Sequence, residues 1–414
     1  MVKILHFADA HIDIANQGRR DPQSGLPVRV LDFLKSLDKI VDTAIEEKVD
    51  LVIFAGDAYK DRSPAPTFQR EWGKRMIRLS LAGIPTILLV GNHDRSPALG
   101  RANALQEFDT LQVPHIWTIS QPTLLKPGDL EGLPVQVMAI PWVSRSGLMN
   151  SLGMSASQTD LAYQEIESRL EMLVNTWLGQ INPALPVVLT AHASIEGAKY
   201  GSERSVMLGA DVTLAGRLVR NPQIDYVALG HIHKAQNLNE NGHPPVIYPG
   251  SIERVDFGEA RDEKFFVVAE VNRGSTHVTW HKLEGRNFID RFIKITSPDN
   301  IFKQVVEALP EQSRLEDSIV RLTIEYPHDW ESLINEPDIR VYLNPAFEFH
   351  FIRRPQIESR LRLPSNQTIS SLTPEDLLEI YWKSINTPTE EMKELQTLAK
   401  DIIQHTSEPD HGEF

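Results

Sequence analysis

Five short polar motifs, each directly after a run of apolar residues, carry the side chains of this sequence that could do chemistry. Their polar side chains are all Asp, Asn or His, which bind divalent cations such as Mn²⁺, Fe, Zn²⁺ and Mg²⁺. The chain has no cysteine, which excludes disulfides, thiolate zinc sites and cysteine nucleophiles. The motifs are, in chain order, Asp9-x-His11, Gly56-Asp57, Gly91-Asn92-His93-Asp94, Ala191-His192 and Gly230-His231-x-His233.

The number of these side chains indicates two metal ions rather than one. A single ion does not need seven ligands, whereas two ions that share one carboxylate do, with positions left for water and substrate. Two divalent ions about 3.5–4 Å apart are a common device for attack on phosphorus, because one ion activates the water and both neutralise the phosphoryl oxygens. The motifs together therefore predict a two-metal site for phosphoester hydrolysis.

Each motif alone is a weak signal, and a structural interpretation stands beside the chemical one. Gly, Asn and Asp are common turn formers, so the stretch from Gly91 to Asp94 is also typical of a polar turn after a strand. A single histidine such as His192 is more often a core or surface residue than a ligand. The recurrence of the pattern after five apolar runs favours the metal site.

The apolar runs before the motifs predict the strands that would position them. Buried strands are expected over residues 2–8, 50–55, 86–90, 135–140, 186–191 and 224–229. Helical periodicity is found over residues 29–48, 66–83 and 159–179. Alternating strands and helices predict an α/β fold, in which sites form at the carboxyl ends of the strands.

The pattern changes after residue 285. Up to that point, further strands are expected over residues 246–248, 264–270 and 276–283. Beyond it, a helix is expected over residues 299–309, and strands over 288–296, 318–326, 339–343 and 347–352. We interpret residues 1–285 as the domain that carries the motifs and residues 286–355 as a small separate α+β domain.

The last part of the chain predicts a polar linker over residues 356–371, two short helices within 372–404, and a disordered tail over 405–414. Thr373 is a typical N-cap for the first helix, and Thr387 opens the second with a capping box. Tethered amphipathic helices are typical of a partner-binding module, although they could instead pack on the core of their own chain. Candidate partner-binding residues are Leu378, Tyr381, Trp382, Leu395 and Ile402.

The bulk properties describe an acidic globular protein of 414 residues with a formal net charge of −14. The chain has no long apolar run and no signal peptide at its start, so we expect a cytoplasmic protein that does not enter a membrane. Nucleic-acid binding is largely electrostatic, so this charge alone favours an enzyme acting on small substrates. Two bound divalent cations would reverse the local field and allow a DNA backbone at the site.

The order of the motifs resembles that of the calcineurin-like metallophosphoesterase superfamily. More narrowly, the sequence resembles the SbcD/Mre11 family of nuclease subunits at residues 4–11, 228–235 and 248–251, and in Phe257-Gly-Glu259 with Lys264. The resemblance covers residues 1–285 well and the last third of the chain by layout. It implies a four-layer α/β/β/α sandwich, a capping domain that helps recognise DNA, and a C-terminal helix-loop-helix.

The resemblance also implies a role for each motif residue. Asp57 would bridge two divalent ions, with Mn²⁺ favoured over Mg²⁺, Fe or Zn²⁺. The other ligands would form one set for each ion, namely Asp9, His11 and His233 for the first and Asn92, His192 and His231 for the second. His93 would face the scissile phosphate and stabilise the transition state or protonate the leaving oxygen. Asp94 would orient His93 through a hydrogen bond.

One position departs from the family pattern. The family often carries His or Asp a few residues after Gly56-Asp57, where this chain has Lys60 and Asp61. A lysine there could contact a phosphate group, although a solvated loop residue is the simpler interpretation.

The activity implied by the resemblance is that of a Mn²⁺-dependent DNA nuclease, both a double-strand exonuclease and a single-strand endonuclease. It would work with an SMC-like ATPase subunit of the SbcC/Rad50 type in DNA break repair, as a homodimer formed through residues 66–83 and 101–111. Candidate DNA contacts are Arg19, Arg20, Lys60, Arg353, Arg354, Arg360 and Arg362. The alternatives are a phosphodiesterase or phosphatase for small phosphoesters and a catalytically silent scaffold of the ATPase complex.

Overall fold

The computed structural model of the chain describes residues 1–14, 19–95, 101–143, 159–201, 213–356, 372–384 and 387–407. The chain divides into two compact units. The first comprises Met1–Arg291, Leu309–Leu322 and Arg340–Phe351, and the second comprises Phe292–Ala308, Thr323–Ile339 and Ile352–Phe414. The predicted linker from residue 357 onward, with Arg360 and Arg362, lies outside the described residues, as does the predicted tail from residue 408.

The first unit contains two six-stranded sheets, and the first of them has the order β14-β13-β1-β2-β3-β4. Strands β1 to β4 are parallel, and β13 runs antiparallel to both β1 and β14. Parallel pairing brings the carboxyl ends of β1, β2 and β3 to one edge of the sheet. The strands are β1 (Val2–Phe7), β2 (Leu51–Phe54), β3 (Thr86–Leu89), β4 (Ile116–Ile119), β13 (Lys264–Asn272) and β14 (Ser275–Leu283).

The second sheet has the order β11-β12-β10-β7-β6-β5. Its four central strands are parallel, and the two edge strands β11 and β5 are antiparallel to their neighbours. The carboxyl ends of β7 and β10 therefore lie side by side. The strands are β5 (Thr123–Leu125), β6 (Gln136–Ile140), β7 (Val187–His192), β10 (Tyr226–Gly230), β11 (Gln236–Asn237) and β12 (Val246–Tyr248).

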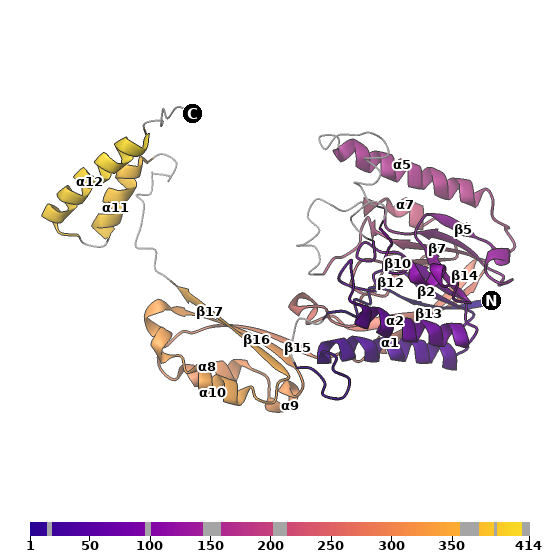
Figure 1. Cartoon of the computed structure of the whole chain (residues 1–414), viewed down its shortest axis with the longest axis horizontal. Coiled ribbons are helices and arrows are strands. Elements are labelled where there is room, and N and C mark those ends of the chain that lie inside the picture. The colour runs from indigo at the N-terminus through magenta and orange to yellow at the C-terminus, as the bar shows by residue number, and fades with distance from the viewer. Residues whose placement is uncertain are drawn as a thin grey trace. The chain divides into compact units, whose positions relative to one another are not determined.

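Three buried apolar clusters join the two sheets and their helices into layers. One cluster lies between the sheets and includes Ile53 and Ile87 from the first and Val137 and Val188 from the second. The other two pack α1 (Val28–Glu46) and α2 (Pro66–Leu81) on the first sheet, and α5 (Thr159–Leu178) on the second. Figure 1 shows α1 and α2 on the opposite side of the sheets from α5. The first unit is therefore a four-layer α/β/β/α sandwich.

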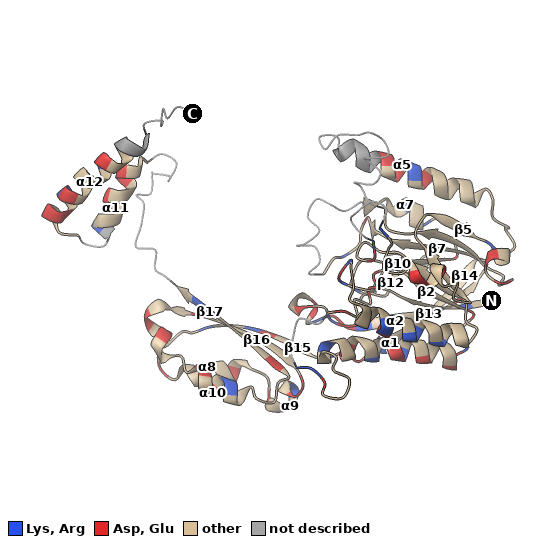
Figure 2. Ribbon diagram, in the orientation of Figure 1, with Lys and Arg blue, Asp and Glu red and all other residues tan. Residues whose placement is uncertain are grey.

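The helices α1 and α2 follow from their apolar spacing and from the charges on their shared outer face. Phe33 and Val41 on α1 and Trp72 on α2 are buried in the cluster against the first sheet. On the outer face, Arg75 of α2 binds Asp38 of α1 at 2.7 Å. In the ribbon of Figure 2, basic and acidic residues both occur along this pair of helices. The pair is thus held by burial on one side and by charge on the other.

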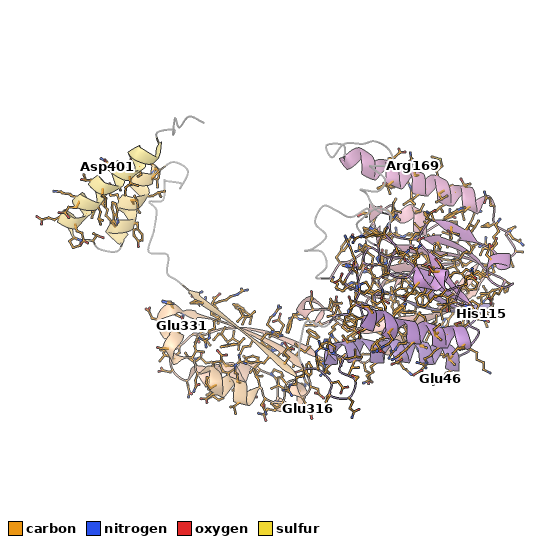
Figure 3. All side chains as sticks on the ribbon, viewed as in Figure 1. Glu46, His115, Arg169, Glu316, Glu331 and Asp401 are labelled. Carbon is orange, nitrogen blue, oxygen red and sulfur yellow. The ribbon has the colours of Figure 1, made fainter. Side chains whose placement is uncertain are left out.

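Helix α5 has the same division into an apolar and a polar face. Ile166 and Val174 are buried against the second sheet. Arg169 pairs with Glu165 within the helix at 2.6 Å, and Figure 3 places Arg169 on the outer layer. Shorter elements of the same unit are α3 (Glu107–Thr110), α7 (Gly216–Val219), β8 (Ser194–Ile195) and β9 (Thr213–Leu214).

A three-stranded sheet follows the sandwich along the chain, with the order β15-β16-β17. Its strands are β15 (Phe288–Lys294), β16 (Ile319–Pro327) and β17 (Glu348–Gln356), and helices α8 (Ile301–Ala308), α9 (Gln312–Leu315) and α10 (Glu336–Tyr342) lie between them in sequence. The strand predicted over residues 339–343 is wrong, because this segment lies in α10. Before that helix, Asn335 donates from its amide to the Asp338 carboxylate at 2.6 Å, and its Oδ1 lies 3.5 Å from the Asp338 N–H. The alternating apolar residues Ile339 and Val341 are what suggested a strand.

The last two helices, α11 (Pro374–Ser384) and α12 (Thr389–Ser407), pack against each other. The predicted N-cap of α11 is confirmed, since the Asp376 N–H donates to Thr373 Oγ1 at 3.2 Å. Helix α12 begins at Thr389, which is later than the start predicted from the capping box at Thr387. The carbonyl of Pro388 accepts the first helical hydrogen bond, from Met392, so Pro388 directly precedes the helix.

The five candidate partner-binding residues differ in exposure. Tyr381 and Ile402 are 46% and 57% exposed, and Leu378 and Leu395 are half-buried. Trp382 is only 9% exposed, so it offers little surface to a partner. Among the described residues, no helix is long and apolar enough to cross a membrane.

Candidate metal centre

The five motifs meet at one place, between the carboxyl ends of the parallel strands of both sheets. Asp9 and Asp57 follow β1 and β2, and Asn92 follows β3. His192 ends β7, and His231 follows β10 directly. Both sheets therefore contribute side chains to one centre.

The first cluster consists of Asp9, His11 and His233, whose ligand atoms all lie within 4.8 Å of one another and are buried. His11 Nδ1 donates to the Tyr59 carbonyl at 3.1 Å, and His233 Nδ1 donates to the Glu259 carboxylate at 2.7 Å. In their neutral forms both rings direct an unprotonated Nε2 into the cluster, and these two nitrogens are 3.1 Å apart. Two lone pairs at that distance repel each other unless a cation lies between them, so this donor set fits a metal ion.

The second cluster consists of Asp57, His192 and His231, whose ligand atoms also lie within 4.8 Å of one another. Asn92 joins it, because its Oδ1 lies 3.0 Å from His192 Nε2 and 3.0 Å from His231 Nδ1. Asp57 Oδ2 is 3.4 Å from His192 Nε2 and 3.9 Å from the ring of His11 in the first cluster. One carboxylate oxygen is therefore within reach of both clusters, as a bridging ligand must be.

The charges of the centre couple its acids to its histidines. Burial would raise the pKa of Asp57, but His192 outweighs it and holds the pKa well below its usual range. Burial would lower the pKa of His192, but Asp57 and Asp9 outweigh it and raise the pKa to about 9. Because a histidine binds a cation only through an unprotonated nitrogen, cation binding at His192 displaces a proton.

His93 and Asp94 are both at the centre, but they do not contact each other as expected. His93 Nδ1 donates to the Lys60 carbonyl at 2.8 Å. The carboxylate of Asp94 instead accepts the backbone N–H groups of Asp57, Ala58 and Gly91, at 2.8–2.9 Å. The prediction that Asp94 orients His93 through a hydrogen bond is therefore wrong. Asp94 fastens the loop after β2 to the loop after β3, and a sequence motif does not show which of these partners a carboxylate takes.

Two glycines in the motifs are required by close approach of the backbone. A Cβ at position 91 would lie 2.1 Å from Asp57 Oδ1, and a Cβ at position 230 would lie 2.1 Å from the Ala55 carbonyl. Both distances are far below a van der Waals contact. Any other residue at Gly91 or Gly230 would displace the loop that carries Asp57.

A buried polar network supports His233 and was not predicted as part of the site. Glu259 Oε1 accepts from His233, while its Oε2 lies 2.6 Å from Lys264 Nζ and 3.2 Å from Ser251 Oγ. Burial would raise the pKa of Glu259, but Lys264 and His233 outweigh it and hold the pKa well below its usual range. A carboxylate behind a ligating histidine fixes its tautomer and orientation. The sequence did contain a signal, because Phe257-Gly-Glu259 and Lys264 contributed to the family resemblance, but no role was assigned to them.

Trp142 is a second neighbour of the centre that the sequence did not indicate. Its ring centroid lies 4.9 Å from that of His231 and 6.1 Å from that of His192, and the side chain is half-buried. Its backbone N–H donates to the Val90 carbonyl, which ties it to the end of β3. Trp142 thus forms an aromatic wall beside the second cluster.

The candidate DNA contacts lie in different surroundings. Lys60 is exposed and lines a cleft of about 690 Å³ together with His93. Arg19 and Arg20 are exposed, and Arg20 donates to the Gly25 carbonyl at 2.9 Å. Arg353 is bound to Glu336 at 2.6 Å and Arg354 is exposed. Lys60 is thus the one among the five that the structure places beside a motif residue.

This arrangement of two sheets and two clusters of metal-binding side chains is that of a metal-dependent phosphoester hydrolase. The chain belongs to the calcineurin-like phosphoesterase family, whose model matches residues 2–235. The family and the fold class expected from the motif order are thereby confirmed.

Several named proteins are similar to this chain. The SbcD subunit of the nuclease SbcCD of Escherichia coli (strain K12) is 23% identical over 426 residues, which cover 98% of this chain and 96% of that protein. DNA double-strand break repair protein Mre11 of Saccharolobus solfataricus is 28% identical over 254 residues, covering 61% of this chain and 54% of that protein. Metallophosphoesterase YhaO of Bacillus subtilis (strain 168) is 25% identical over 277 residues, covering 65% of this chain and 57% of that protein.

Proposed function

We propose that the protein is a Mn²⁺-dependent DNA nuclease that acts with an SMC-like ATPase subunit in the processing of DNA breaks. The observation that carries this proposal is the position of Asp57 between the two clusters, with His93 beside it at the edge of an open cleft. Two divalent ions held there would activate a water molecule and neutralise the oxygens of a phosphodiester. The similarity to the SbcD subunit of the nuclease SbcCD over nearly the whole chain supports DNA as the substrate.

The ligands would divide as the family resemblance implies. Asp57 would bridge the two ions. The first ion would be held by Asp9, His11 and His233, and the second by Asn92, His192 and His231. Oxygen and imidazole ligands without thiolate suit Mn²⁺, while Mg²⁺, Fe and Zn²⁺ are the other ions that such a set can bind.

His93 would protonate the leaving oxygen or stabilise the charge that develops on it. Its Nδ1 is engaged by the Lys60 carbonyl, which leaves Nε2 for the substrate. Burial lowers the pKa of His93, while Asp57 and the Lys60 carbonyl counteract this effect. A phosphodiester anion against Nε2 adds a further negative charge and favours the imidazolium form, which can donate a proton to the leaving oxygen.

The cleft beside His93 would take the leaving side of the substrate. It has a volume of about 690 Å³, and its lining includes the cations Lys60 and Arg62, the carboxylates Asp13 and Asp61, and the ring of Phe68. Cations suit the next phosphate group along a strand, and an apolar ring suits a base or sugar. The bound metal ions would offset the negative charge of the protein at this point.

The remainder of the chain would serve DNA and partner binding. Residues 286–355 would form the capping domain, with Arg353 and Arg354 as DNA contacts in addition to Arg19 and Arg20 of the first unit. The helix pair at residues 372–404 would dock on the coiled coil of the ATPase through Tyr381 and Ile402. Apolar side chains exposed near α2 and α3, namely Ile77, Leu81 and Leu111, would support the homodimer.

A pull-down tests the proposed docking. Residues 364–414, immobilised, should retain the coiled coil of the ATPase subunit, and Tyr381→Ala with Ile402→Ala should weaken retention. If the helix pair retains no coiled coil, the docking proposal fails while the nuclease proposal stands.

A second candidate function is hydrolysis of small phosphodiesters. The size of the cleft favours it, since pockets for small ligands are typically about 300–1,000 Å³ in volume. The helix pair and the three-stranded sheet argue against it, because a small substrate requires neither.

One experiment separates these functions. Purified protein is incubated with Mn²⁺ and linear or hairpin DNA, and in parallel with a chromogenic phosphodiester. We expect DNA cleavage that falls by at least about 10²-fold in His93→Gln, which removes the general acid, while Mn²⁺ binding is retained. His115→Gln is the matched control, because His115 lies away from the motifs and pairs with Glu131 at 2.7 Å (Figure 3).

The outcomes distinguish the nuclease from the two alternatives. Cleavage of the chromogenic ester without cleavage of DNA would replace the nuclease proposal with the small-substrate alternative. Cleavage of neither compound by a protein that binds Mn²⁺ would favour the silent scaffold.

A further inference from the structure

Asp13 follows the first motif and lines the cleft beside His93, but it is neither a predicted metal ligand nor a predicted DNA contact. Its carboxylate accepts two backbone hydrogen bonds from the loop after β2. Oδ1 accepts the N–H of Lys60, and Oδ2 accepts the N–H of Asp61 at 2.9 Å. Within the described residues Asp13 forms no ion pair, so these backbone dipoles are what satisfy its charge.

The two peptide units whose N–H groups donate to Asp13 also bind two imidazoles through their carbonyl groups. The unit that joins Tyr59 to Lys60 presents its carbonyl to His11 Nδ1 at 3.1 Å. The unit that joins Lys60 to Asp61 presents its carbonyl to His93 Nδ1 at 2.8 Å. Each oxygen of Asp13 therefore fixes one peptide plane, and each plane fixes one histidine.

We propose that Asp13 is a positioning residue that sets the orientation and tautomer of both His11 and His93 through these two peptide units. The inference deepens the proposed function, because it concerns the residues through which that function would bind metal and protonate the leaving group. It also gives a structural meaning to the departure at Lys60. The backbone carbonyl at this position orients His93, whatever residue type stands there.

The physical reason lies in the geometry and polarity of a trans peptide. The N–H and C=O groups of one unit point in opposite directions, so a hydrogen bond on one side aims the group on the other. A carboxylate bound to the N–H polarises the unit and makes its carbonyl a stronger acceptor. Without Asp13, the exposed loop from Lys60 to Ser63 would be free to rotate these planes.

The two imidazoles are also close enough to depend on a common support. The rings of His11 and His93 meet edge to face, with centroids 5.2 Å apart and an angle of 89° between their planes. A rotation of either peptide unit would move one ring against the other. The single carboxylate of Asp13 thus supports both His11, a predicted metal ligand, and His93, the predicted general acid.

The test uses the full-length protein with Asp13→Ala, Asp13→Asn and a matched control. The control is Asp21→Asn, which alters another loop carboxylate that accepts a backbone N–H, from Ser24. The ring nitrogens of protein labelled with ¹⁵N-histidine are observed by NMR without paramagnetic metal. Spectra of His11→Gln and His93→Gln assign the two signals.

We expect wild type and Asp21→Asn to show a proton on Nδ1 of both histidines. Asp13→Ala should show mixed tautomers at both positions, and Asp13→Asn an intermediate effect, because an amide can accept only one of the two N–H groups. With Mn²⁺ and DNA, kcat of Asp13→Ala should fall by about 10–100-fold while KM stays within about twofold.

Two results would overturn the inference. One is unchanged tautomers of His11 and His93 in both Asp13 variants. The other is a lowered melting temperature with kcat unchanged, which would make Asp13 a residue of general stability only. If Asp13→Ala does not fold, Asp13→Asn carries the same comparison. Failure of the proposed function is distinguishable, because a wild type that cleaves no DNA still reports its tautomers by NMR.

Discussion

Replacement of Glu259 by Gln would separate the stability of the fold from the support of the metal centre. Glu259 and Lys264 are each 1% exposed and are joined at 2.6 Å. The same carboxylate accepts from His233 Nδ1 at 2.7 Å. One substitution therefore breaks a buried ion pair and also weakens the acceptor behind a predicted metal ligand.

The two effects have different expected sizes. Removal of one partner leaves the ammonium of Lys264 buried with the Ser251 hydroxyl and the His233 carbonyl as its other contacts. Such a loss typically costs about 3–5 kcal/mol of unfolding free energy. Loss of an acceptor behind a ligating histidine typically weakens metal binding about 10–100-fold, or about 1.4–2.7 kcal/mol.

A second variant isolates the metal effect. Glu259→Gln combined with Lys264→Met removes the unpaired ammonium, so most of the lost stability should return. The affinity for Mn²⁺ should stay low, because the amide remains a weaker acceptor for His233 than the carboxylate. Glu253→Gln is the control, since Glu253 is also a buried carboxylate but accepts from the backbone of Arg254 and Arg286 instead.

Denaturant unfolding measures the stability of each variant, and isothermal titration with Mn²⁺ measures affinity and stoichiometry. We expect Glu259→Gln alone to lose both stability and affinity, and the double variant to recover only the first. If the double variant binds Mn²⁺ as tightly as wild type, the charge of Glu259 does not support His233 and the reasoning fails. If Glu259→Gln unfolds like wild type, the buried pair contributes nothing to stability.

Three further predictions concern other parts of the chain. Gly91→Ala should reduce Mn²⁺ stoichiometry below two in a titration, because its Cβ would lie 2.1 Å from Asp57 Oδ1, whereas Gly128→Ala meets nothing within 4 Å and should match wild type. Burial lowers the pKa of His6 to about 3 from an ordinary 6.5. Between pH 6.5 and 3 the unfolded chain therefore binds a proton at His6 that the folded chain does not. The contribution of His6 to stability is complete above pH 6.5 and is lost as the pH falls towards 3. Denaturant unfolding should show His6→Gln losing about 2 kcal/mol less than wild type between pH 7 and pH 5. Trp382→Ala should cost about 3–5 kcal/mol within the helix pair, seen as faster hydrogen exchange in α11 and α12 with β1 unchanged.

The sequence predicted the elements whose signal is local and repeated. The strands before the five motifs are found within one or two residues of their expected bounds, because each is a short apolar run closed by glycine or a polar residue. The convergence of the motifs followed from parallel strands alone. A sequence pattern could not show which partner a polar group takes, so Asp94 was paired with His93 when three backbone N–H groups bind it. Ile339 and Val341 favoured a strand, but the segment is part of helix α10.

The neighbours of the metal centre that were not predicted are distant in sequence from the residues they contact. Glu259 lies 26 residues after His233 and contacts it from the segment before β13, the strand that pairs with β1. Trp142 reaches the second cluster because its backbone is bound to the end of β3. Neither contact has a signature in local periodicity, and both required the three-dimensional arrangement of the two sheets.

Backbone strain at the ligand positions connects the fold to its proposed chemistry. Positive φ angles of 50°, 40°, 65° and 100° occur at Asp9, His11, Asp57 and His231. Such conformations cost on the order of 1–3 kcal/mol each and persist only where surrounding contacts impose them. Here the contacts come from the ligands, since the His11 N–H donates to the Asp57 carbonyl and the His231 N–H donates to the Asp9 carboxylate. The ligand positions thus hold one another in place before a cation binds.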